Sequence, residues 1–371
     1  MQIIEVKTKR DIKEFIEFPL RLYKGCRQFV PPLYGDEKKL LLAGGKPDIS
    51  ESVFYLAKRG GETVGRIQGI LQKQYNELHG KRQVRFTRFD TVDDTEVAAA
   101  LLGAVEAWGR ELGMNEVCGP LGYSDLDREG LLVEGFEEEQ TFEEQYNYEY
   151  YGALVEGCGY EKDVDWLEFE IKAPDKPNPM LKRVAERTLE LNKLHVADTS
   201  VSKKDYIAKY KDGVFDLLDE CYSKLYGTVP ISEDMKAELI DQFMLILNKE
   251  FLIIICDEAE KPVAFGLCFP NIGEAVKKSG GRLTPLALMK LLRIAKRPTC
   301  VDMGLVAVHP SYQNAGLNAV IMDILMDALV SGKIRKSETN LNLETNTAVI
   351  AQWKYFNSRQ HKRRRAYVKK I

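Results

Sequence analysis

The chain carries one order of structural elements twice, and this internal duplication limits its architecture more than any other feature. In each half, apolar residues with a period of two alternate with apolar stripes at helical spacing. Residues 55–65 and 253–264 correspond in order and approximate spacing, as two strands joined by a short turn. The duplication predicts two similar modules, each an α/β fold with a mixed sheet.

A polar segment separates the two halves. Residues 172–179 read KAPDKPNP, with three prolines among eight residues. Proline restricts the residue before it to extended conformations, so such a segment is typical of a linker. A chain of 371 residues is long enough for two domains with separate cores. We therefore expect one module at residues 1–173 and a second at residues 180–371.

The hydrophobic patterns place the elements of each half in parallel order. In the first half we expect strands at 2–6, 53–58, 63–71, 83–90, 116–120 and 166–171, and helices at 9–22, 95–112 and 141–156. In the second half we expect strands at 195–198, 251–256, 262–269, 303–308, 340–343 and 365–369, and helices at 204–226, 232–247, 283–296, 317–329 and 347–356. The basic helix at 283–296 belongs to an inserted segment, 271–298, that the first half lacks.

Residues 301–329 form the most informative stretch of the second half. An apolar strand is followed by a loop with proline and then by a helix that a glycine precedes. The N–H groups of a helix's first turn have no partner in the helix and lie at the positive end of its dipole. The stretch therefore predicts a phosphate or pyrophosphate site. An ordinary strand–turn–helix, with the glycine serving packing, is the alternative.

Composition excludes several classes of protein. The formal net charge is −3, which argues against a general nucleic-acid or membrane-surface binder but leaves room for local basic patches. The seven cysteines are scattered and include no C-x-x-C pair, which indicates reduced thiols and no metal site. No apolar run approaches the length of a membrane span, and no secretion signal opens the chain. We expect a cytoplasmic protein that does not enter a membrane.

The pattern Val306-x-Val308-x-Pro310-x-x-Gln313-x-x-Gly316-x-Asn318, in this element order, resembles the GNAT superfamily of N-acetyltransferases. The resemblance implies two tandem GNAT-like modules and a co-substrate, acetyl-CoA or another acyl-CoA. In that family the strand backbone pairs with the pantetheine amides, and the loop after it holds the pyrophosphate. The residues carried over as coenzyme contacts are Val306, Val308, Gln313, Asn314, Ala315, Gly316, Leu317 and Asn318.

One position of the motif departs from the family pattern. The last position, here Asn318, is usually Gly or Ala, which lets the backbone approach the pyrophosphate closely. Both Asn318 and Asn314 can donate hydrogen bonds to a phosphate oxygen. We therefore keep the loop at 313–318 as the expected pyrophosphate site.

The resemblance also implies catalytic positions. The family often shows Asn after the fifth strand and Tyr seven residues later; here Asn346 fits, but the later position is Trp353. An indole cannot deliver a proton, so Tyr355 is the candidate acid and Trp353 is read as a core residue. Glu344 is the candidate general base, with Asp302 as an alternative, although a salt-bridged carboxylate is the ordinary state of such residues.

The first half lacks the phosphate loop. The corresponding segment, residues 90–95, has three carboxylates and no glycine. Asp94 or Thr95 is better read as a helix N-cap. We expect the first module to be a degenerate GNAT-like unit that forms one wall of a shared cleft or a dimer surface.

Two charged runs remain. Residues 134–144 are acidic and either receive a cationic acceptor or form a solvated loop. Residues 359–365, with Lys369 and Lys370, are basic and either grip a coenzyme phosphate, an RNA backbone or an acidic partner, or form a surface patch without a dedicated role.

These observations favour an enzyme that transfers an acetyl or other acyl group from coenzyme A to an amine of a small molecule or peptide. Positioning and a backbone N–H near Val308 that polarises the carbonyl would supply most of the catalysis. The alternatives are a FemABX-like aminoacyl transferase using tRNA and a non-catalytic GNAT-like binding protein. The sequence is compatible with a monomer or a homodimer.

Overall fold

The computed structural model describes residues 1–46, 48–223, 225–331 and 333–371. The first half contributes strands β1 (Gln2–Glu5), β2 (Ser50–Arg59), β3 (Glu62–Gln72), β4 (Gln83–Thr91), β5 (Glu116–Gly119), β6 (Leu131–Glu134) and β7 (Glu161–Lys172). The second half contributes β8 (His195–Val196), β9 (Leu252–Cys256), β10 (Pro262–Pro270), β11 (Cys300–Val308), β12 (Lys336–Thr339), β13 (Asn342–Leu343) and β14 (Ser358–Lys370).

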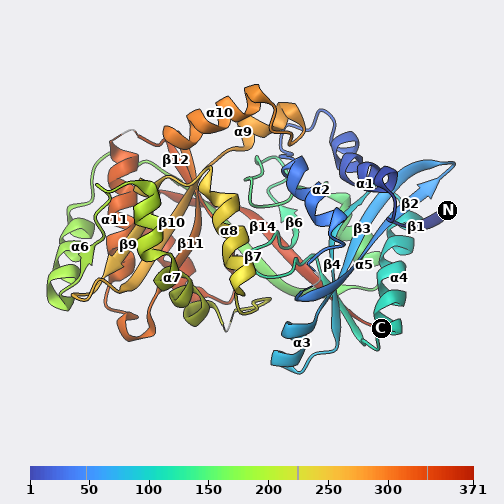
Figure 1. Cartoon of the computed structure of the whole chain (residues 1–371), viewed down its shortest axis with the longest axis horizontal. Helices are drawn as coiled ribbons and strands as arrows, with labels where there is room; N and C mark the ends of the chain where they lie inside the picture. The colour runs from blue at the N-terminus through green and yellow to red at the C-terminus, as the bar shows by residue number, and fades with distance from the viewer. Residues whose placement is uncertain (47, 224, 332) are drawn as a thin grey trace.

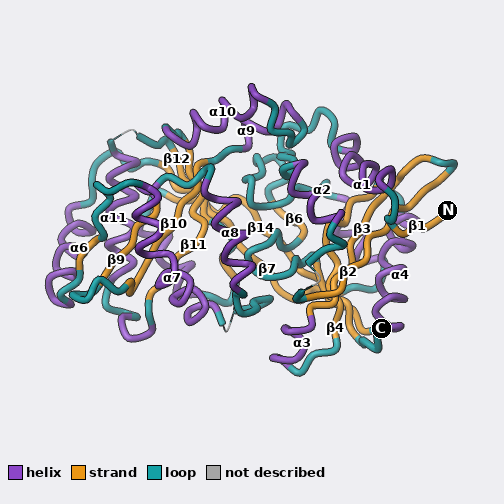
Figure 2. The backbone as a smooth tube through the Cα atoms, in the orientation of Figure 1, coloured by secondary structure: helices purple, strands orange, loops and turns teal. Residues whose placement is uncertain are grey.

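Helices cover the outside of both halves (Figure 2). Those of the first half are α1 (Lys9–Leu22), α2 (Tyr34–Leu42), α3 (Lys73–His79), α4 (Thr95–Glu111) and α5 (Tyr150–Gly157). Those of the second half are α6 (Pro179–Asn192), α7 (Lys203–Tyr222), α8 (Glu233–Met244), α9 (Gly273–Val276), α10 (Pro285–Lys296), α11 (Leu317–Val330) and α12 (Thr347–Gln352). Short 3₁₀ turns are η1 (Lys249–Phe251), η2 (Lys277–Ser279), η3 (Pro310–Tyr312) and η4 (Trp353–Tyr355).

The strands of both halves form one continuous mixed sheet. Its order is β1-β2-β3-β4-β5-β14-β7-β12-β11-β10-β9-β8, with β6 on β14 and β13 on β7. On either side of the central pair the order mirrors itself, because β2 to β5 correspond to β9 to β12. The expected mixed α/β fold and the duplication of element order are confirmed.

The last strand of each half crosses into the sheet of the other half. Ile171 of β7 pairs antiparallel with Ser337 of β12, although β7 ends the first half in sequence. Tyr367 of β14 pairs with Gly119 of β5, and the C-terminus lies beside α4 in the first half (Figure 1). The two halves are joined by this exchange. The division into residues 1–173 and 180–371 remains a prediction, and it marks no break in the sheet.

Buried ion pairs hold the exchanged strands together. Lys362 and Arg364 of β14 are each 1% exposed. Lys362 Nζ lies 3.0 Å from Glu338 and 3.4 Å from Glu168, and Arg364 Nε lies 2.6 Å from Glu168. Burial alone would raise the pKa of Glu338, but the charges of Lys362 and Lys336 lower it to about 2. Charges this deeply buried are tolerated only when they are paired.

The basic run at 359–365 is therefore an element of the sheet and not a free surface patch. Arg363 and Arg365 lie 3.1 and 2.8 Å from Asp165, and Arg359 lies 3.1 Å from Glu170. The expectation that this run grips a phosphate, an RNA backbone or an acidic partner is wrong, because its arginines are paired with carboxylates of β7. The local sequence shows the charge of these residues but not their partners.

The acidic run at 134–144 is also paired within the protein. Glu138 lies 2.6 Å from Arg359, and Glu144, 4% exposed, lies 3.6 Å from Arg364.

The helix expected at 141–156 begins only at Tyr150, because Asn147 instead bonds the backbone N–H and carbonyl of Leu132 at 2.7 and 3.0 Å. Asparagine commonly competes with helix formation in this way.

Apolar residues at helical spacing account for the helices whose observed bounds agree best with the expected ones. α4 buries Val97, Leu101 and Val105 completely, at the helical spacing seen in the sequence. Each such side chain stabilises the fold by roughly 1.5–3 kcal/mol relative to exposure. The inserted basic helix expected at 283–296 is α10. The helix expected at 204–226 ends at Tyr222 as α7, and residue 224 lies outside the described residues.

Candidate active site

The sheet of the second half splits beside β11. Its parallel pairing with β12 ends at Met303 and Thr339, after which the chain leaves β11 and continues as β13 on β7. Within the described ranges, residues 304–308 have β10 on one side and no strand on the other. Val306 is 43% exposed although it lies on an interior strand. This open edge offers backbone groups to a ligand that carries amides.

Side chains from the end of α7 bond the open edge. The Tyr222 hydroxyl accepts a hydrogen bond from the Val306 N–H at 3.3 Å and donates one to the Val306 carbonyl at 3.1 Å. The Cys221 thiol donates to the Val308 carbonyl at 3.3 Å. Burial and then the charge of Asp125 raise the pKa of Tyr222, so the phenol is protonated and can donate. The two valines predicted to contact coenzyme therefore line the split.

The loop after β11 turns sharply into α11. Asn314 and Gly316 both have left-handed backbones, with φ of +67° and +91°. Gly316 is the N-cap of α11, and no side chain caps the first turn of that helix. The first N–H groups of α11 are therefore available to an anion at the positive end of the helix dipole. This geometry is the one expected for residues 313–318.

The individual loop residues differ in role. Gly316 is required by its φ and by space, because a Cβ there would lie 2.8 Å from the Thr188 hydroxyl of α6. That hydroxyl donates to the Ala315 carbonyl at 3.3 Å. Leu317 is 1% exposed and belongs to the core. The remaining polar residues of the loop are exposed: Gln313, Asn314 and Asn318.

Of the three residues predicted to be catalytic, two are engaged in local contacts and one is exposed. Asn346 caps α12 by accepting from the Val349 N–H at 3.3 Å. Glu344 forms an ion pair with Lys162 at 2.7 Å. Tyr355 is 71% exposed. In the described part of the chain, no hydrogen bond or ion pair joins any of the three to residues 304–308.

The other positions weighed from the sequence are structural in their contacts. Trp353 is 5% exposed, and its indole N–H donates to Asn342 at 3.2 Å, as expected for a core residue. Asp302, 5% exposed, lies in the paired part of β11, where burial and then the charge of Glu338 raise its pKa well above the ordinary range.

Two carboxyl groups that the sequence did not single out lie in the first half, and the charge of one of them, Asp125, acts on Tyr222 at the split. Asp125 and Glu129 belong to the irregular segment between β5 and β6. Burial raises the pKa of Asp125 to about 6. Burial, and then the charges of Asp125 and Glu144, raise the pKa of Glu129 well above its ordinary value. Perturbed carboxyls of this kind are typical of general acids and bases.

Arg85 holds this acidic segment against the second half. Its guanidinium donates to the carbonyls of Gly122 and Gly227, each at 3.0 Å, so one buried side chain bridges both halves. Gly227, at φ of +81°, leaves room for Glu129, whose Oε1 would lie 3.1 Å from a Cβ there. Glu129 is 3% exposed, and this oxygen has no hydrogen-bond partner among the described residues. A buried carboxyl oxygen without a partner is unusual in folded proteins.

The corresponding edge in the first half is filled. β4 pairs with β5 only over residues 83–85. Beyond that split, the Thr91 N–H donates to the Tyr151 hydroxyl at 3.1 Å, and the Tyr150 hydroxyl donates to the Thr91 carbonyl at 2.7 Å. Tyr151 is fully buried. Asp94 caps α4 by accepting from two backbone N–H groups, which confirms the predicted N-cap. The first half thus closes its edge with a fully buried tyrosine and caps its helix, whereas in the second half the edge is bonded by the partly buried Tyr222 and the helix has no side-chain cap.

One group of possible metal ligands occurs in the described chain. Side-chain atoms of His195, Cys256 and Glu260 lie within 4.8 Å of one another. The Lys209 ammonium lies 2.8 Å from Glu260, which makes a further cation there electrostatically unfavourable. The group lies on β8, β9 and the turn after β9, at the end of the sheet, where β9 is two strands and β8 three strands from β11.

Comparison with known proteins defines the class of fold. The chain superposes over 100% of its length on a tandem GNAT protein from the clavulanic acid biosynthesis pathway, with 98% of that chain covered, a TM-score of 0.57 and 12% identity. GNAT denotes the GCN5-related N-acetyltransferases. The chain therefore has a tandem GNAT fold.

Two curated proteins resemble the sequence along most of its length. Protein YghO of Escherichia coli (strain K12) is 29% identical over 379 residues, covering 98% of this chain and 94% of that protein. The bacterial ceramide synthase of Caulobacter vibrioides (strain NA1000 / CB15N) is 28% identical over 300 residues, covering 79% of this chain and 76% of that protein. No protein-family model matches the chain.

Proposed function

We propose that the chain transfers an acyl group from coenzyme A to an amine, with the coenzyme held by its second half. The observation that carries this proposal is the open edge of β11 leading directly into the uncapped N-terminus of α11. An extended ligand that carries both amides and a pyrophosphate matches these two neighbouring features. The tandem GNAT fold supports the same assignment.

The residues that would hold the coenzyme follow from this geometry. The backbones of Val306 and Val308 would pair with pantetheine amides after the Tyr222 hydroxyl moves away. The N–H groups of residues 316–318 would bind the pyrophosphate, with the exposed amides of Gln313, Asn314 and Asn318 beside it. When bound, the coenzyme supplies the acyl group as a thioester.

The acidic segment of the first half would receive the amine. Asp125, with a pKa of about 6, is ionised at neutral pH and can accept a proton from the amine as its nitrogen bonds to the acyl carbon. The carbon–sulfur bond of the thioester then breaks, and coenzyme A leaves as a thiolate that takes up a proton to become the free thiol. The N–H of Val308, two residues after Val306 on the same edge, would polarise the acyl carbonyl. We prefer Asp125 to Glu344 as the base because Glu344 is already paired with Lys162.

The acceptor belongs to the class of small-molecule amines. Partly buried carboxyls near the split favour an ammonium group. One relative is named a ceramide synthase, and ceramides are amides of long-chain amino alcohols, which supports long-chain amino alcohols as acceptors. The alternative of an aminoacyl transferase using tRNA has lost its main support, because the basic run at 359–365 is paired with carboxylates.

Calorimetry and thiol release test this proposal. We expect acetyl-CoA or a longer acyl-CoA to bind the full chain, and free thiol to appear when an accepted amine is added. The amine panel should include simple diamines, amino alcohols and long-chain amino alcohols. No heat and no thermal stabilisation with any acyl-CoA at millimolar concentration would disprove the proposal. Binding without turnover across the panel would identify a GNAT-like binding protein instead.

A further inference from the structure

α10 exposes apolar side chains to solvent. The four large ones are Leu283, just before the helix, and Leu286, Met289 and Leu292 within it, exposed by 44, 73, 62 and 45%. α10 lies along the outer edge of the molecule with α9, at the top of Figure 1. A cluster of this size on one short helix is more than the scattered apolar residues of an ordinary surface.

The opposite side of α10 already anchors the helix. Ala287, Leu291 and Ala295 are buried, and Leu291 packs into a core cluster with Ile272 and Val276. The exposed leucines and methionine are therefore not needed for packing within the chain. They form a second apolar face that no element of the described structure covers.

The charge of the same segment has one sign. Residues 282–297 contain five basic residues and no acidic residue. Arg293, Lys296 and Arg297 are exposed, and Lys290 pairs with Glu274 at 3.3 Å. At 100° per residue, Leu286, Met289, Arg293 and Lys296 project to the same side of the helix. The exposed face is thus apolar and basic together.

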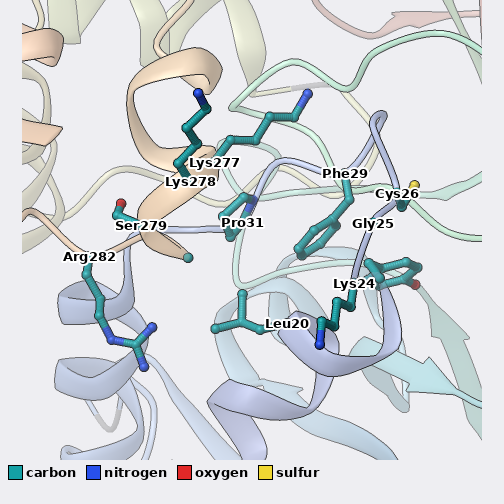
Figure 3. A pocket seen from close by; sticks show the side chains of 12 residues that line it. Leu20, Lys24, Gly25, Cys26, Phe29, Pro31, Lys277, Lys278, Ser279 and Arg282 are labelled. Carbon is teal, nitrogen blue, oxygen red and sulfur yellow. The ribbon is translucent and has the colours of Figure 1, made fainter.

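A basic pocket adjoins the start of this segment. It has a volume of about 400 Å³ and lies between the end of α1 and η2. Figure 3 shows Lys24, Lys277, Lys278 and Arg282 among the side chains around it. Lys277 pairs with Glu139 and Arg282 pairs with Glu17, whereas Lys24 and Lys278 have no acidic partner in the described chain. The positive surface therefore extends beyond α10.

We propose that α10 docks on the surface of an anionic lipid bilayer. The apolar residues would enter the boundary between headgroups and acyl chains, and the basic residues would contact anionic headgroups. A helix of 12 residues is about 18 Å long, which suits a helix lying in the interface. No helix in the described residues is long and apolar enough to cross a membrane.

Charge complementarity distinguishes this occupant from others. A second copy of the chain packed symmetrically through α10 would bring two basic faces together, which costs free energy. Nucleic acid would leave the leucines and methionine without apolar contacts, since α10 has no aromatic residue to stack on bases. An anionic bilayer satisfies both the apolar and the basic residues.

α6 provides an internal control. It also exposes apolar residues, with Met180 at 74% and Leu191 at 68%. The same helix carries Glu186 and Glu190 beside three basic residues, so its charges nearly cancel and favour an anionic surface much less than those of α10. Exposure of apolar residues is thus common to both helices, and only α10 adds an all-basic charge.

Vesicle co-sedimentation of the full chain tests the proposal without coenzyme or amine, so its outcome is separate from that of the acyl-transfer assay. We expect binding to phosphatidylcholine vesicles that contain phosphatidylglycerol, weaker binding in high salt, and little binding to phosphatidylcholine alone. Leu286→Gln with Met289→Gln should weaken binding about tenfold. Arg293→Gln with Lys296→Gln should weaken it at low salt by about fivefold or more. Met180→Gln with Leu191→Gln should have no effect.

Several results would overturn the proposal. These are equal loss of binding with the α6 variant, binding that is independent of lipid charge, and no binding to anionic vesicles. A monomer–dimer change caused by the Leu286 and Met289 substitutions, without vesicle binding, would assign the face to a second copy. Salt-sensitive binding of RNA or DNA alone would assign it to nucleic acid. Thermal melts of each variant check folding, and if the apolar variant unfolds, the Arg293 and Lys296 variant and the salt dependence of the natural chain decide.

Discussion

The Tyr222 hydroxyl bonds both backbone groups of Val306, accepting from the N–H at 3.3 Å and donating to the carbonyl at 3.1 Å. One phenol thus takes the two positions that a neighbouring strand or an amide ligand would use. In the first half, two tyrosines bond the backbone of Thr91 in a similar way: Tyr151 accepts from its N–H, and Tyr150 donates to its carbonyl. There, Tyr151 is fully buried in the core. Tyr222 is the last residue of α7, and its side chain is only partly buried. Its hydrogen bonds to Val306 can therefore be exchanged for hydrogen bonds from Val306 to a ligand.

Replacing Tyr222 with Phe should strengthen coenzyme binding. The substitution removes the bonds that a pantetheine amide would have to displace, and a net hydrogen bond contributes about 0.5–1.5 kcal/mol. We expect the Kd of coenzyme A, measured by calorimetry, to fall by about fivefold. Tyr210→Phe, the same change on α7 where the hydroxyl bonds Glu260, should leave the Kd unchanged. Weaker binding by Tyr222→Phe would mean that the hydroxyl contacts the ligand directly.

Asp125→Asn should abolish the acid limb of the pH–rate profile. A base with a pKa of about 6 gives a kcat/KM that rises with pH through about 6 and then levels off. We expect the Asn variant to lose roughly 10²–10⁴-fold in kcat/KM and to retain coenzyme binding. Glu344→Gln is the matched comparison between the two candidate bases. A large loss in that variant with full activity in Asp125→Asn would reverse the assignment.

Gly316→Ala should reduce both stability and coenzyme binding. Alanine at φ of +91° is strained, and its Cβ would lie 2.8 Å from the Thr188 hydroxyl. We expect a loss of about 1–3 kcal/mol in the free energy of unfolding by urea denaturation, together with weaker binding of coenzyme A. Gly103→Ala in α4 is the control, since a Cβ there meets no atom within 4 Å and alanine favours a helix. Equal effects of the two substitutions would argue against a special backbone at 316.

Lys362→Met should destabilise the junction between the halves. The substitution leaves the buried carboxylates of Glu168 and Glu338 without their shared cation. Breaking a buried pair in this way costs about 3–5 kcal/mol. Lys370→Met, on the same strand but with a side chain 78% exposed, should cost less than about 1 kcal/mol. Denaturant unfolding of both variants measures the difference, and similar losses would contradict the buried network.

Thermal stability should be greatest near pH 5. Burial raises the pKa of Glu143 to about 7 and of Glu144 to about 8, and that of Asp125 to about 6. As the pH falls from 8 toward 5, the folded chain binds protons that an unfolded chain, with carboxyl pKa values near about 4, does not yet bind. Stability therefore rises over this range.

Below that range the sign reverses. Burial alone would raise the pKa of Glu37, but the charge of Arg88 lowers it to about 2. The charges of Lys362 and Lys336 likewise lower the pKa of Glu338 to about 2. The unfolded chain then takes up protons first, so stability is lost as the pH falls from about 4 to 2. Differential scanning fluorimetry from about pH 3 to about pH 9 measures how the Tm depends on pH. A Tm that rises steadily from pH 5 to 8 would contradict the assignment.

Local sequence was enough to predict much of the fold. The period of apolar residues in α4, the capping carboxylate of Asp94 and the turn at Gly316 all act within a few residues of one another. Such short-range effects can be read from a single chain. The motif at 306–318 likewise predicted a strand, a tight loop and a helix in the observed order. The roles of Glu344, Asn346 and Tyr355 in catalysis remain predictions.

The candidate site was only partly predictable, because local patterns relate only residues that are close together in the sequence. Asp125 and Glu129 lie about 180 residues before Val306 in sequence, and no local pattern relates them to it. Tyr222 falls within the helix expected at 204–226, and nothing in the sequence around it indicates a contact with Val306. The acidic run at 134–144 is visible in the sequence. Its partners Arg359 and Arg364 lie on β14, more than about 200 residues later in the chain.

The sequence by itself determined the repeated order of elements, the strand, glycine turn and helix of the second half, and the acid-capped helix at the corresponding place in the first, because these follow from residue periodicity and backbone preferences. Only the tertiary structure decided that β7 and β14 change places between the halves, so that the basic C-terminal run pairs with Glu168, Glu338 and Asp165. Strand pairing over such separations depends on the packing of the whole chain, which composition and local pattern do not encode.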